Sequence, residues 1–340
     1  MDLHGRSLLA VTDLSPEEFM YLVELARDLR TEKRLGRCVR QLEGKNIGLI
    51  SEMTSTGDVA AFEVAAHDEG AQVSYLGPGE TPLGPKKSIK DTARVLGRIF
   101  DGIEHCGSDQ DTVETLAAYA GVPVWNGLTD TWHPTQMLAD ILTVTDHCAK
   151  PLSAVSLCYL GDGRSITANS LLVTGGLLGM DLRVCAPPAL RPAQAVQLAA
   201  GRLAPRSGAR LTVTSDVRSA VAGADFLYTD AWLPFGEPGH DWENEPGRDR
   251  EKRIDQLLPY QVNPHVIAAT GNSNVKFMHC LPTRYIRRSG VGLRHGQRQV
   301  ADLEVVDELF EPAASVVFDQ AENRVHTSKA LMVATLGRKA

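Results

Sequence analysis

The stretch that decides the fold is NIGLISEMTSTGDVAAFEVAAHDEGAQVSYL, residues 46–76. Asn46–Ser51 is a short apolar run of the kind that forms a buried strand, and Val59–Asp68 spaces its apolar residues as a helix does. Ala71–Leu76 has the pattern of a second strand, and a polar, glycine-containing loop separates the first strand from the helix. Strand–helix–strand units of this kind build parallel sheets, so the stretch predicts an α/β fold.

The same alternation continues on both sides of a break at Lys150-Pro151. Before the break, the predicted elements are helices over Ser15–Arg34, Lys90–Ile99 and Asp111–Tyr119 and a strand over Val122–Trp125. After it, the predicted strands are Ala154–Leu160, Asp181–Cys185, Arg210–Thr214, Phe226–Thr229 and Lys276–His279, with helices over Ala168–Leu178, Val217–Ala222 and Asn323–Leu336. Two α/β halves of similar size therefore lie in tandem, which predicts two Rossmann-like parallel-sheet domains.

The length and composition narrow the class of protein. A single core stops growing near roughly 250–300 residues, so a chain of 340 residues favours two domains. With 43% hydrophobic and 23% charged residues, the composition is that of a globular protein rather than a disordered one. The net charge of −7 argues against nucleic acid as the main partner, because phosphate backbones select basic surfaces.

The sequence predicts a cytoplasmic protein without a membrane span. No window reaches the roughly 18–20 apolar residues that a span needs, and no basic leader followed by an apolar run opens the sequence. The cysteines are scattered without a C-x-x-C pair, which signals neither a zinc cluster nor a redox dithiol, so we expect reduced thiols. They are Cys38, Cys106, Cys148, Cys158, Cys185 and Cys280.

Ligands of parallel-sheet folds bind at the carboxyl ends of the strands. The loops to inspect are therefore those that follow Ser51, Leu160, Thr229 and His279. The loop Gly161–Ser165 resembles a nucleotide-binding fingerprint but lacks its third glycine, because Ile166 stands there. A tight strand-to-helix turn is the better interpretation of this loop.

Two further motifs carry polar or sulfur side chains at the ends of predicted elements. His133 and Gln136 stand at the start of a helical run, where both can hydrogen-bond a small carbonyl or amide group. The alternative is a capping Thr135 with a structural histidine. Cys280 ends a buried strand, where a thiol either packs or presents a polarizable side chain to a reacting amine. A free nucleophile would need a base and an electropositive setting, which the sequence does not show.

These motifs together resemble the aspartate/ornithine carbamoyltransferase family, specifically its ornithine branch. The matching stretches are Phe62–Ala66, Ser88–Arg98, Val122–Thr129, His133–Gln136, Tyr228–Asp230, His279–Pro282 and Asp319–Arg324. The resemblance implies an enzyme that moves a carbamoyl group from carbamoyl phosphate to the side-chain amine of ornithine, with no metal and no organic cofactor. It also implies a donor domain of residues 1–149 plus a C-terminal helix at 321–338, an acceptor domain of residues 150–320, and a homotrimer with sites at subunit interfaces.

The donor site departs from the family pattern. The family's phosphate loop reads Ser-Thr-Arg-Thr-Arg, and the matching residues here are Ser55, Thr56, Gly57, Asp58 and Val59. A further family arginine falls at Cys106, and the glutamine that a neighbouring subunit contributes falls at Pro82. Loss of three arginines removes roughly 4–9 kcal/mol of donor binding, and the carboxylate of Asp58 repels a dianion. The sequence therefore predicts that ordinary carbamoyl phosphate is not the donor.

The groups that surround the reacting centre are retained. By the resemblance, Asp230 meets the substrate's α-amino group, and Cys280 and Leu281 lie beside the reacting amine. The groups around the carbamoyl carbonyl and amide are His133, Gln136 and Arg324. The family's ornithine-contacting asparagine is replaced by Ile166, and its Ser-Met-Gly loop by Pro234-Phe235-Gly236. Arg284, where the family has an aromatic residue, is either a replacement cation or a solvated surface residue.

Three hypotheses follow from this selective pattern. In the first, the chain is an enzyme with changed substrates that acts on the amino group of an amino-acid-like molecule, in a setting such as secondary metabolism. In the second, it is a divergent but genuine carbamoyltransferase that binds phosphate through Arg284, Lys86 or Lys87. In the third, it is a catalytically silent subunit with a binding or regulatory role. Because only the phosphate-binding groups are lost and the groups around the reacting centre are retained, the pattern favours the first hypothesis.

Overall fold

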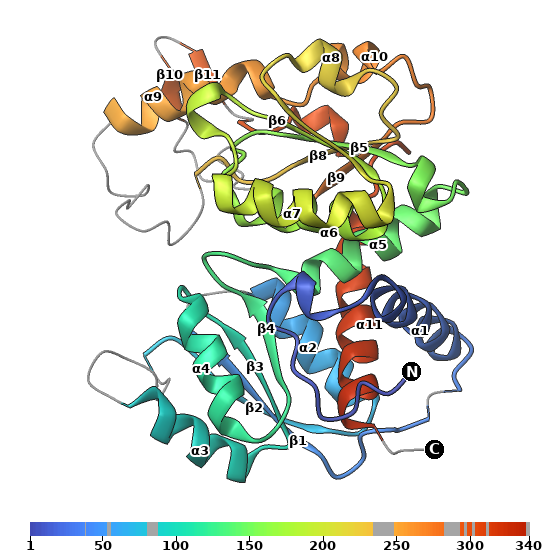
Figure 1. Cartoon of the computed structure of the whole chain (residues 1–340), viewed down its shortest axis with the longest axis vertical. Helices are drawn as coiled ribbons and strands as arrows, with labels where there is room; N and C mark the ends of the chain where they lie inside the picture. The colour runs from blue at the N-terminus through green and yellow to red at the C-terminus, as the bar shows by residue number, and fades with distance from the viewer. Residues whose placement is uncertain are drawn as a thin grey trace. The chain divides into compact units, whose positions relative to one another are not determined.

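The chain forms two compact units, seen in the computed structural model in Figure 1. Unit 1 comprises Met1–Thr143 and Ala321–Ala340, and unit 2 comprises Val144–Gln320. The structure describes residues 1–37, 39–52, 56–79, 88–233, 248–281, 293–295, 298–300, 303–310 and 313–337. The predicted α/β fold with two parallel sheets is confirmed, and each unit holds one of the sheets.

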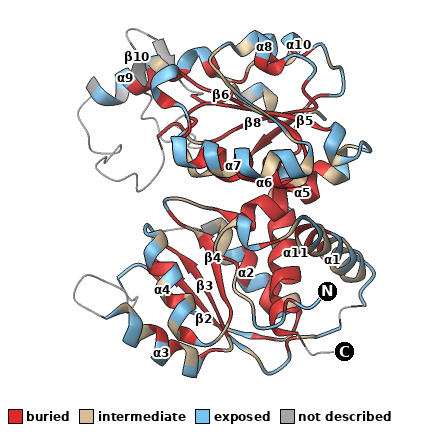
Figure 2. Cartoon of the chain, viewed as in Figure 1, coloured by how far each residue is buried: buried red, intermediate tan, exposed pale blue. Residues whose placement is uncertain are grey.

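Unit 1 is built on a four-stranded parallel sheet in the order β2-β1-β3-β4. Its strands are β1 (Asn46–Ser51), β2 (Gln72–Leu76), β3 (Gly102–Cys106) and β4 (Val124–Leu128). Its helices are α1 (Pro16–Arg34), α2 (Thr56–Asp68), α3 (Ile89–Ile99), α4 (Gln110–Ala120) and, with ends that pass into unit 2, α5 (Pro134–His147) and α11 (Val317–Leu336). Figure 2 shows that burial concentrates on β1, β3 and β4 and on the helix faces turned toward them, whereas the edge strand β2 has no buried residue.

The first helix shows how the local sequence sets an element. The Ser15 side chain accepts a hydrogen bond from the backbone N–H of Glu18, and the Glu18 carboxylate accepts one from the Ser15 N–H, which forms a capping box. Pro16 fits the first turn, where no backbone N–H is needed. Phe19 and Leu22 lie on the buried face. The helix predicted here is confirmed.

Unit 2 is built on a five-stranded parallel sheet in the order β7-β6-β5-β8-β9. Its strands are β5 (Ser156–Leu160), β6 (Asp181–Cys185), β7 (Arg210–Thr214), β8 (Phe226–Thr229) and β9 (Lys276–His279), and a separate antiparallel pair is formed by β10 (Leu293–His295) and β11 (Arg298–Val300). Its helices are α6 (Ile166–Leu178), α7 (Gln194–Ser207), α8 (Val217–Val221), α9 (Arg248–Leu257) and α10 (Pro264–Ala269). Every residue of α6 from Thr167 to Leu177 is buried, as expected for an apolar helix covered on all sides.

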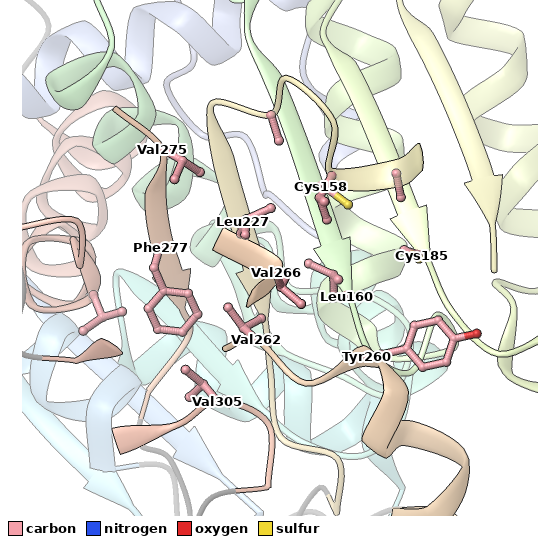
Figure 3. Close-up of a cluster of buried hydrophobic side chains, with 14 of the residues drawn as sticks. Cys158, Leu160, Cys185, Leu227, Tyr260, Val262, Val266, Val275, Phe277 and Val305 are labelled. Carbon is pink, nitrogen blue, oxygen red and sulfur yellow. The ribbon is translucent and has the colours of Figure 1, made fainter. Parts of the chain in front are cut away.

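The core of unit 2 lies against the central strands. Figure 3 shows Leu160 of β5, Leu227 of β8 and Phe277 of β9 packed together with Val262. The ring of Phe277 also meets Phe310 edge-on, with the ring centroids 5.8 Å apart. Each fully buried side chain of this size contributes about 1.5–3 kcal/mol, so this packing fixes the strands whose ends carry the polar residues described below.

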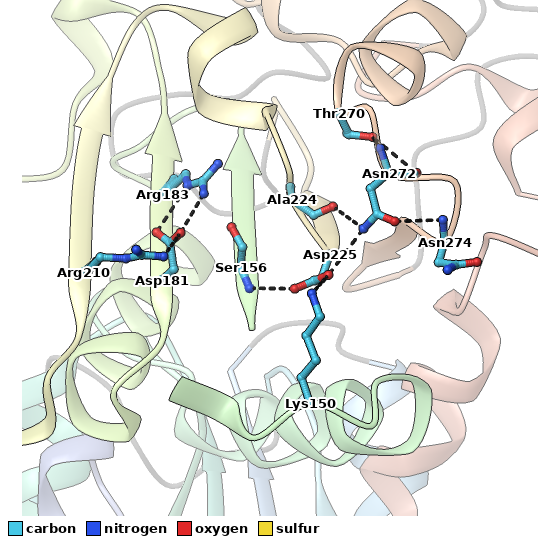
Figure 4. Close-up of polar contacts among 10 residues, drawn as sticks. All are labelled: Lys150, Ser156, Asp181, Arg183, Arg210, Ala224, Asp225, Thr270, Asn272 and Asn274. Carbon is cyan, nitrogen blue, oxygen red and sulfur yellow. Dashed lines mark hydrogen bonds and ion pairs between the residues drawn. The ribbon is translucent and has the colours of Figure 1, made fainter. Parts of the chain in front are cut away.

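Ion pairs and hydrogen bonds hold the amino ends of the unit 2 strands (Figure 4). The Asp225 carboxylate accepts from the Lys150 ammonium at 2.6 Å and from the Ser156 N–H at 3.0 Å. Burial raises the pKa of Asp181, but hydrogen bonds and charge from Arg183 and Arg210 outweigh it and hold that pKa below its usual range. These charges therefore stabilise the edge of the sheet opposite the carboxyl ends, where ligands bind in such folds.

Each sheet has a point where the strand order reverses. The reversal lies between β1 and β3 in unit 1 and between β5 and β8 in unit 2. At such a switch point, the loops that leave the two strands diverge and open a crevice for ligands. The loops in question follow Ser51 and Cys106 in unit 1, and Leu160 and Thr229 in unit 2.

Several predicted boundaries are wrong. The strand predicted at Val122–Trp125 is found at Val124–Leu128, because Pro123 has no N–H to give to a ladder. The last helix begins at Val317, six residues before the predicted start. Neither β3 nor α7 was predicted: β3 buries two polar residues, and α7 buries only Val196 and Ala200, so neither shows a clear apolar period.

Two predictions about membranes and thiols concern the whole chain. Within the described ranges, no helix is both long and apolar enough to cross a membrane. The five described cysteines carry free thiols in the structure. Cys38 lies outside the described residues.

Candidate active site

Three elements of unit 1 bring Asp58, His133 and Arg324 together. Asp58 lies in the first turn of α2, which follows β1, while His133 directly precedes α5 and Arg324 lies in α11, beside α2 in Figure 1. The Oδ1 atom of Asp58 is 3.5 Å from Nη1 of Arg324 and 3.9 Å from Nε2 of His133. The acidic residue that replaces the family's threonine is therefore paired with the arginine that the sequence placed at the carbonyl.

The pair extends into a chain of hydrogen bonds. Arg324 Nε donates to Gln136 Oε1 at 2.6 Å, and Gln136 Nε2 donates to Asp140 Oδ1 at 2.6 Å. We call Asp58, His133, Gln136, Asp140 and Arg324 the Asp58–Arg324 network. The side chains of Asp58 and Arg324 keep only 12% and 10% of their surface exposed. Charges buried to this extent are stable only when they are paired.

His133 is uncharged at neutral pH. Burial lowers its pKa from 6.5 to about 4, although the nearby Asp58 carboxylate acts in the opposite direction. The ring also hydrogen-bonds to the backbone of Gly127. Since a neutral imidazole has one N–H donor and one acceptor nitrogen, His133 can polarise a carbonyl or accept a proton without first losing a charge.

A second acid lies near Asp58. Glu104, in the middle of β3, is fully buried, and neither of its carboxyl oxygens has a hydrogen-bond partner in the described part of the chain. Burial, followed by repulsion from Asp58, raises the pKa of Glu104 well above its usual value. Burial therefore favours the protonated, uncharged form of Glu104. Cys106, at the end of the same strand, is also fully buried.

The position of Arg324 depends on the glycine beside it. A Cβ atom added at Gly57 would lie 2.7 Å from Arg324 Nη1, so the guanidinium occupies the space next to residue 57. A larger side chain at this position would require Arg324 to move. Gly57 and Asp58 thus act together, because one admits the guanidinium and the other neutralises it.

In unit 2, hydroxyl groups surround the carboxylate of Asp230, which follows β8. The Tyr159 hydroxyl, from β5, donates to Asp230 Oδ1 at 2.5 Å, and the side chains of Ser165 and Thr167 also hydrogen-bond to the carboxylate. Burial raises the pKa of Asp230 to about 6, because it outweighs these three hydrogen bonds. Asp230 is therefore a buried anion above pH 6, poised to pair with a cationic group.

The loop that supplies Ser165 is held by two arginines. Asp162 accepts hydrogen bonds from Arg164 Nε and Nη2, at 3.2 and 3.0 Å, and pairs with Arg253 of α9. Gly161 has a φ of 144°, a backbone conformation that side-chain-bearing residues rarely adopt. The predicted strand-to-helix turn is confirmed at this loop.

Cys280 and Leu281 follow β9, at the same end of the sheet as Asp230 on the neighbouring strand β8. Leu281 has a φ of 26°, which is uncommon for a residue with a side chain, and its N–H donates to His279 Nδ1 at 3.1 Å. The N–H of His279 in turn donates to Gln320 Oε1 at 3.0 Å. Residues that their surroundings hold in an unusual backbone conformation cluster at functional sites, so the conformation of Leu281 supports this segment as part of a functional site.

The structure brings some of the predicted site residues together and leaves others aside. Gly57, Asp58, His133, Gln136 and Arg324 converge in unit 1. Val59 and Ile166 are half-buried near the starts of α2 and α6, and Thr56 is described only as the first residue of α2. The predicted residues that lie outside the described ranges are Ser55, Pro82, Lys86, Lys87, Pro234 and Arg284.

Sequence reasoning missed the partners of these residues. Asp140 stands four residues after Gln136 in α5. This spacing places the two side chains on the same face of a helix, so the sequence could have predicted their contact. Ser165 and Thr167 flank the predicted Ile166. The sequence around Glu104 has no pattern that distinguishes a buried acid from an exposed one, so its burial could not be predicted. Among the described residues, no three His, Cys, Asp or Glu side chains gather as metal ligands.

Sequence comparison relates both units to known domains. The carbamoyl-P binding domain of the aspartate/ornithine carbamoyltransferases matches residues 6–146, and the Asp/Orn binding domain of the same family matches residues 153–335. The chain belongs to the aspartate/ornithine carbamoyltransferase family. It is a transferase-fold enzyme of the ornithine carbamoyltransferase type, as its relatives indicate.

Those relatives align with almost the whole chain. The catabolic ornithine carbamoyltransferase of Rhizobium meliloti (strain 1021) is 50% identical over 343 residues, which covers 99% of each protein. An ornithine carbamoyltransferase of Haemophilus influenzae (strain PittGG) is also 50% identical, over 98% of this chain and 99% of the relative. Among solved structures, the ornithine carbamoyltransferase of Pyrococcus furiosus superposes with a TM-score of 0.87 at 34% identity, over 100% of each chain.

Proposed function

We propose that this carbamoyltransferase-family enzyme acts on the amino group of an amino-acid-like substrate and does not use ordinary carbamoyl phosphate as its donor. The observation that carries the proposal is the ion pair between Asp58, in the first turn of α2, and Arg324 of α11, whose Oδ1 and Nη1 atoms lie 3.5 Å apart. In the family, this turn and its arginines hold the phosphate. In this chain, a carboxylate of the protein stands there instead.

Charge balance argues against a phosphate dianion in unit 1. A hydrogen bond to a charged group contributes roughly 1.5–3 kcal/mol, and the family's arginines are replaced at Gly57, Val59 and Cys106. Arg324 already faces the Asp58 carboxylate, and His133 is neutral. The described groups thus offer no cationic surplus, and Asp58 repels an anion from the helix start that would otherwise attract it.

On the acceptor side, Asp230 suits the α-ammonium of an amino acid. Its carboxylate is buried, held by three hydroxyl groups and ionised above pH 6, so an ammonium group would pair with it in a region of low dielectric. Cys280 and Leu281, at the end of the neighbouring strand, would flank the reacting amine.

The roles we assign to His133, Gln136 and Arg324 concern the group that is transferred. As the acceptor amine forms a bond to the carbonyl carbon, negative charge develops on the carbonyl oxygen. The bond from that carbon to the rest of the donor then breaks, the leaving group departs with the bonding electrons, and the amine nitrogen loses a proton. Arg324 is fixed by Gln136 at 2.6 Å, so its donors are oriented before the reaction begins. Preorganised donors of this kind stabilise the transition state more than the ground state.

A second candidate function is that of a genuine but divergent ornithine-type carbamoyltransferase. The 50% identity to the catabolic ornithine carbamoyltransferase of Rhizobium meliloti favours it. It requires other cations to hold the phosphate, and the three that the sequence suggests, Arg284, Lys86 and Lys87, lie outside the described residues. The two candidates differ in one respect that is simple to measure, the use of carbamoyl phosphate. A catalytically silent subunit would form no product with carbamoyl phosphate or with any other donor.

The assembly and setting are also proposals. The stretches Glu63–Leu76 and Ser88–Arg98 follow the family pattern closely, which supports a homotrimer, whereas Pro82 in place of the cross-subunit glutamine suggests that the subunits do not share that ligand. Light scattering tests this: a mass near three chains is expected, and a monomer mass would contradict it. A cytoplasmic enzyme with a role in secondary metabolism fits the changed donor site.

Turnover assays with the full chain test the proposed function. Ornithine and related amino acids are offered with millimolar carbamoyl phosphate, and carbamoylated product is measured. We expect no product, but we expect at least one of the amino acids to bind saturably. The Asp230→Asn variant should abolish this binding, whereas the exposed control Asp249→Asn should leave it unchanged. Efficient formation of citrulline from carbamoyl phosphate would instead establish the second candidate.

A further inference from the structure

We propose that three hydroxyl groups in unit 2 hold the Asp230 carboxylate as an oriented anion for the ammonium group of the substrate. They belong to Tyr159, Ser165 and Thr167, which are therefore positioning residues. The inference rests on the proposed function, in which Asp230 pairs with that ammonium group. It assigns a role to three residues in addition to the site residues predicted from the sequence.

The three hydroxyl groups come from two elements and reach one carboxylate. The Tyr159 hydroxyl, from β5, donates to Asp230 Oδ1 at 2.5 Å. The side chains of Ser165 and Thr167, at the start of α6, also hydrogen-bond to the carboxylate. An ionised carboxylate has about four acceptor sites, so three hydroxyl donors fix its plane and leave room for an N–H of the substrate.

The hydroxyl group of Tyr159 stabilises the anionic form of Asp230 more than the neutral acid. Its single proton can go to Asp230 Oδ1 or to the carbonyl oxygen of Asp162, which is 3.1 Å away. A hydrogen bond to an ionised carboxylate is shorter and stronger than one to a neutral carbonyl. The Tyr159 proton is therefore directed at Asp230 when that carboxylate is ionised, and it can turn to the Asp162 carbonyl when Asp230 is protonated.

The backbone that follows β5 accommodates this arrangement. A Cβ added at Gly161 would lie 3.3 Å from Tyr159 Oη, so the glycine leaves the hydroxyl group its space, and its φ of 144° suits glycine in particular. Ser165 is the N-cap of α6, where its side chain accepts from the Ala168 N–H. The Ser165 oxygen thus serves the helix, while its O–H can donate to Asp230.

The charges around Asp230 do not by themselves keep it ionised. Burial raises its pKa to about 6, and the like charge of Asp162 acts in the same direction. Asp162 is paired with Arg164 and Arg253, which limits this repulsion. The titratable groups at the end of the neighbouring strand β9 are His279 and Cys280. The hydrogen bonds from the three hydroxyl groups lower the pKa of Asp230 and so favour its anion at neutral pH.

Carbon-13 NMR of the unliganded 340-residue chain, labelled at its aspartate carboxyl carbons, tests the role of the hydroxyl groups. The signal that is lost in Asp230→Asn is that of Asp230. We expect it to titrate near pH 6 in the unmodified chain and about 1–2 pH units higher in Tyr159→Phe, the shift that one hydrogen bond to a charged group provides. Thr167→Val, which keeps the shape of the side chain, should shift the titration in the same direction.

Two matched controls remove hydroxyl groups of unit 2 that donate to backbone carbonyls instead. They are Tyr260→Phe and Thr174→Val, and the titration of Asp230 should be unchanged in both. The inference is overturned if Asp230 titrates at the same pH in Tyr159→Phe and Thr167→Val as in the unmodified chain. Should Tyr159→Phe fail to fold, Thr167→Val still decides the result.

Calorimetric titration with ornithine connects the hydroxyl groups to binding. The affinity that Tyr159→Phe loses at about pH 6.5 should return as the pH is raised to about 8.5, because Asp230 is then ionised again. A loss that persists at the higher pH would assign Tyr159 a merely structural role and overturn the inference. If ornithine and related amino acids bind none of these proteins, the proposed function fails, whereas the NMR titration of Asp230 needs no ligand and still decides whether the hydroxyl groups hold the anion.

Discussion

Replacing Asp58 by asparagine should destabilise unit 1 by about 3 kcal/mol. The substitution keeps the size of the side chain and removes the charge that faces Arg324 at 3.5 Å. At that distance and an effective dielectric constant of about 20, the Coulomb attraction is about 5 kcal/mol. Removal of one partner of a buried pair typically costs about 3–5 kcal/mol. We take the lower end, because Gln136 still accepts from Arg324 in the variant.

Thermal unfolding followed by calorimetry measures this change. For a unit of this size, each kcal/mol shifts the midpoint by about 2–4 °C, so Asp58→Asn should lower the transition of unit 1 by about 6–12 °C. The matched control is Asp91→Asn, which removes an acid from the first turn of α3. Asp91 pairs with Arg94 at 3.0 Å, but their side chains are 72% and 52% exposed. Exposed pairs contribute no more than about 1 kcal/mol, so the control should shift the midpoint by a few degrees at most.

The unfolding midpoints of the two variants together show whether the Asp58–Arg324 pair stabilises unit 1. If Asp58→Asn unfolds no earlier than Asp91→Asn, the Asp58–Arg324 pair is not a buried, mutually neutralising pair. If Asp58→Asn raises the midpoint, the carboxylate is a source of repulsion in unit 1 rather than a partner of Arg324. Either result would refute the charge argument on which the donor assignment depends.

Further predictions concern Asp230, His133 and Asp68. Affinity for an α-amino-acid ligand, measured by calorimetric titration, should rise about tenfold per pH unit up to the Asp230 pKa of about 6 and level off above it, since the ammonium pairs with the ionised carboxylate; a pH-independent affinity would contradict this. The contribution of Asp230 to folding runs the other way: because its folded pKa lies above the unfolded value of about 3.9, the stabilisation is complete below pH 4 and is lost as the pH rises through 6. His133→Ala should lower turnover of the true substrates by about 10²–10³ with little change in KM, and unchanged turnover would assign it a structural role. Asp68→Asn should destabilise the fold by about 3 kcal/mol, because the fully buried Lys329 ammonium lies 2.7 Å from Asp68 and would keep only Glu69, at 3.7 Å, as a partner; an unchanged unfolding midpoint would count against this.

The parts of the fold that local pattern determines were predictable from the sequence. The strands β6 and β8 have the predicted bounds, and α1 spans Pro16–Arg34, within one residue of the predicted helix. Where local pattern is weak, prediction was wrong: β3 carries a buried acid and a buried histidine, so its composition does not indicate a strand. The family resemblance supplied residue identities. In the structure, Arg324 hydrogen-bonds to Gln136 and both Arg324 and His133 lie near Asp58, and the roles assigned to these residues stay predictions.

The electrostatics of the site were beyond the sequence. Asp58 was expected only to repel phosphate, because its pairing with Arg324 joins segments far apart in the chain and depends on how α11 packs beside α2. In the same way, the pKa of Asp230 is raised because burial outweighs the hydrogen bonds from Tyr159, Ser165 and Thr167, and a one-dimensional pattern does not bring these residues together. Local composition predicts secondary structure, whereas charge balance requires the tertiary fold.

Isothermal titration of carbamoyl phosphate into the unmodified 340-residue chain tests whether the altered unit 1 site still binds this donor. The reference is a variant with the family residues restored, Gly57→Arg, Asp58→Thr, Val59→Arg and Cys106→Arg. A loss of about 4 kcal/mol or more corresponds to roughly a thousandfold in affinity. We expect no saturable binding below millimolar concentration in the unmodified chain and binding that is tighter by orders of magnitude in the restored variant. Micromolar binding by the unmodified chain would contradict it.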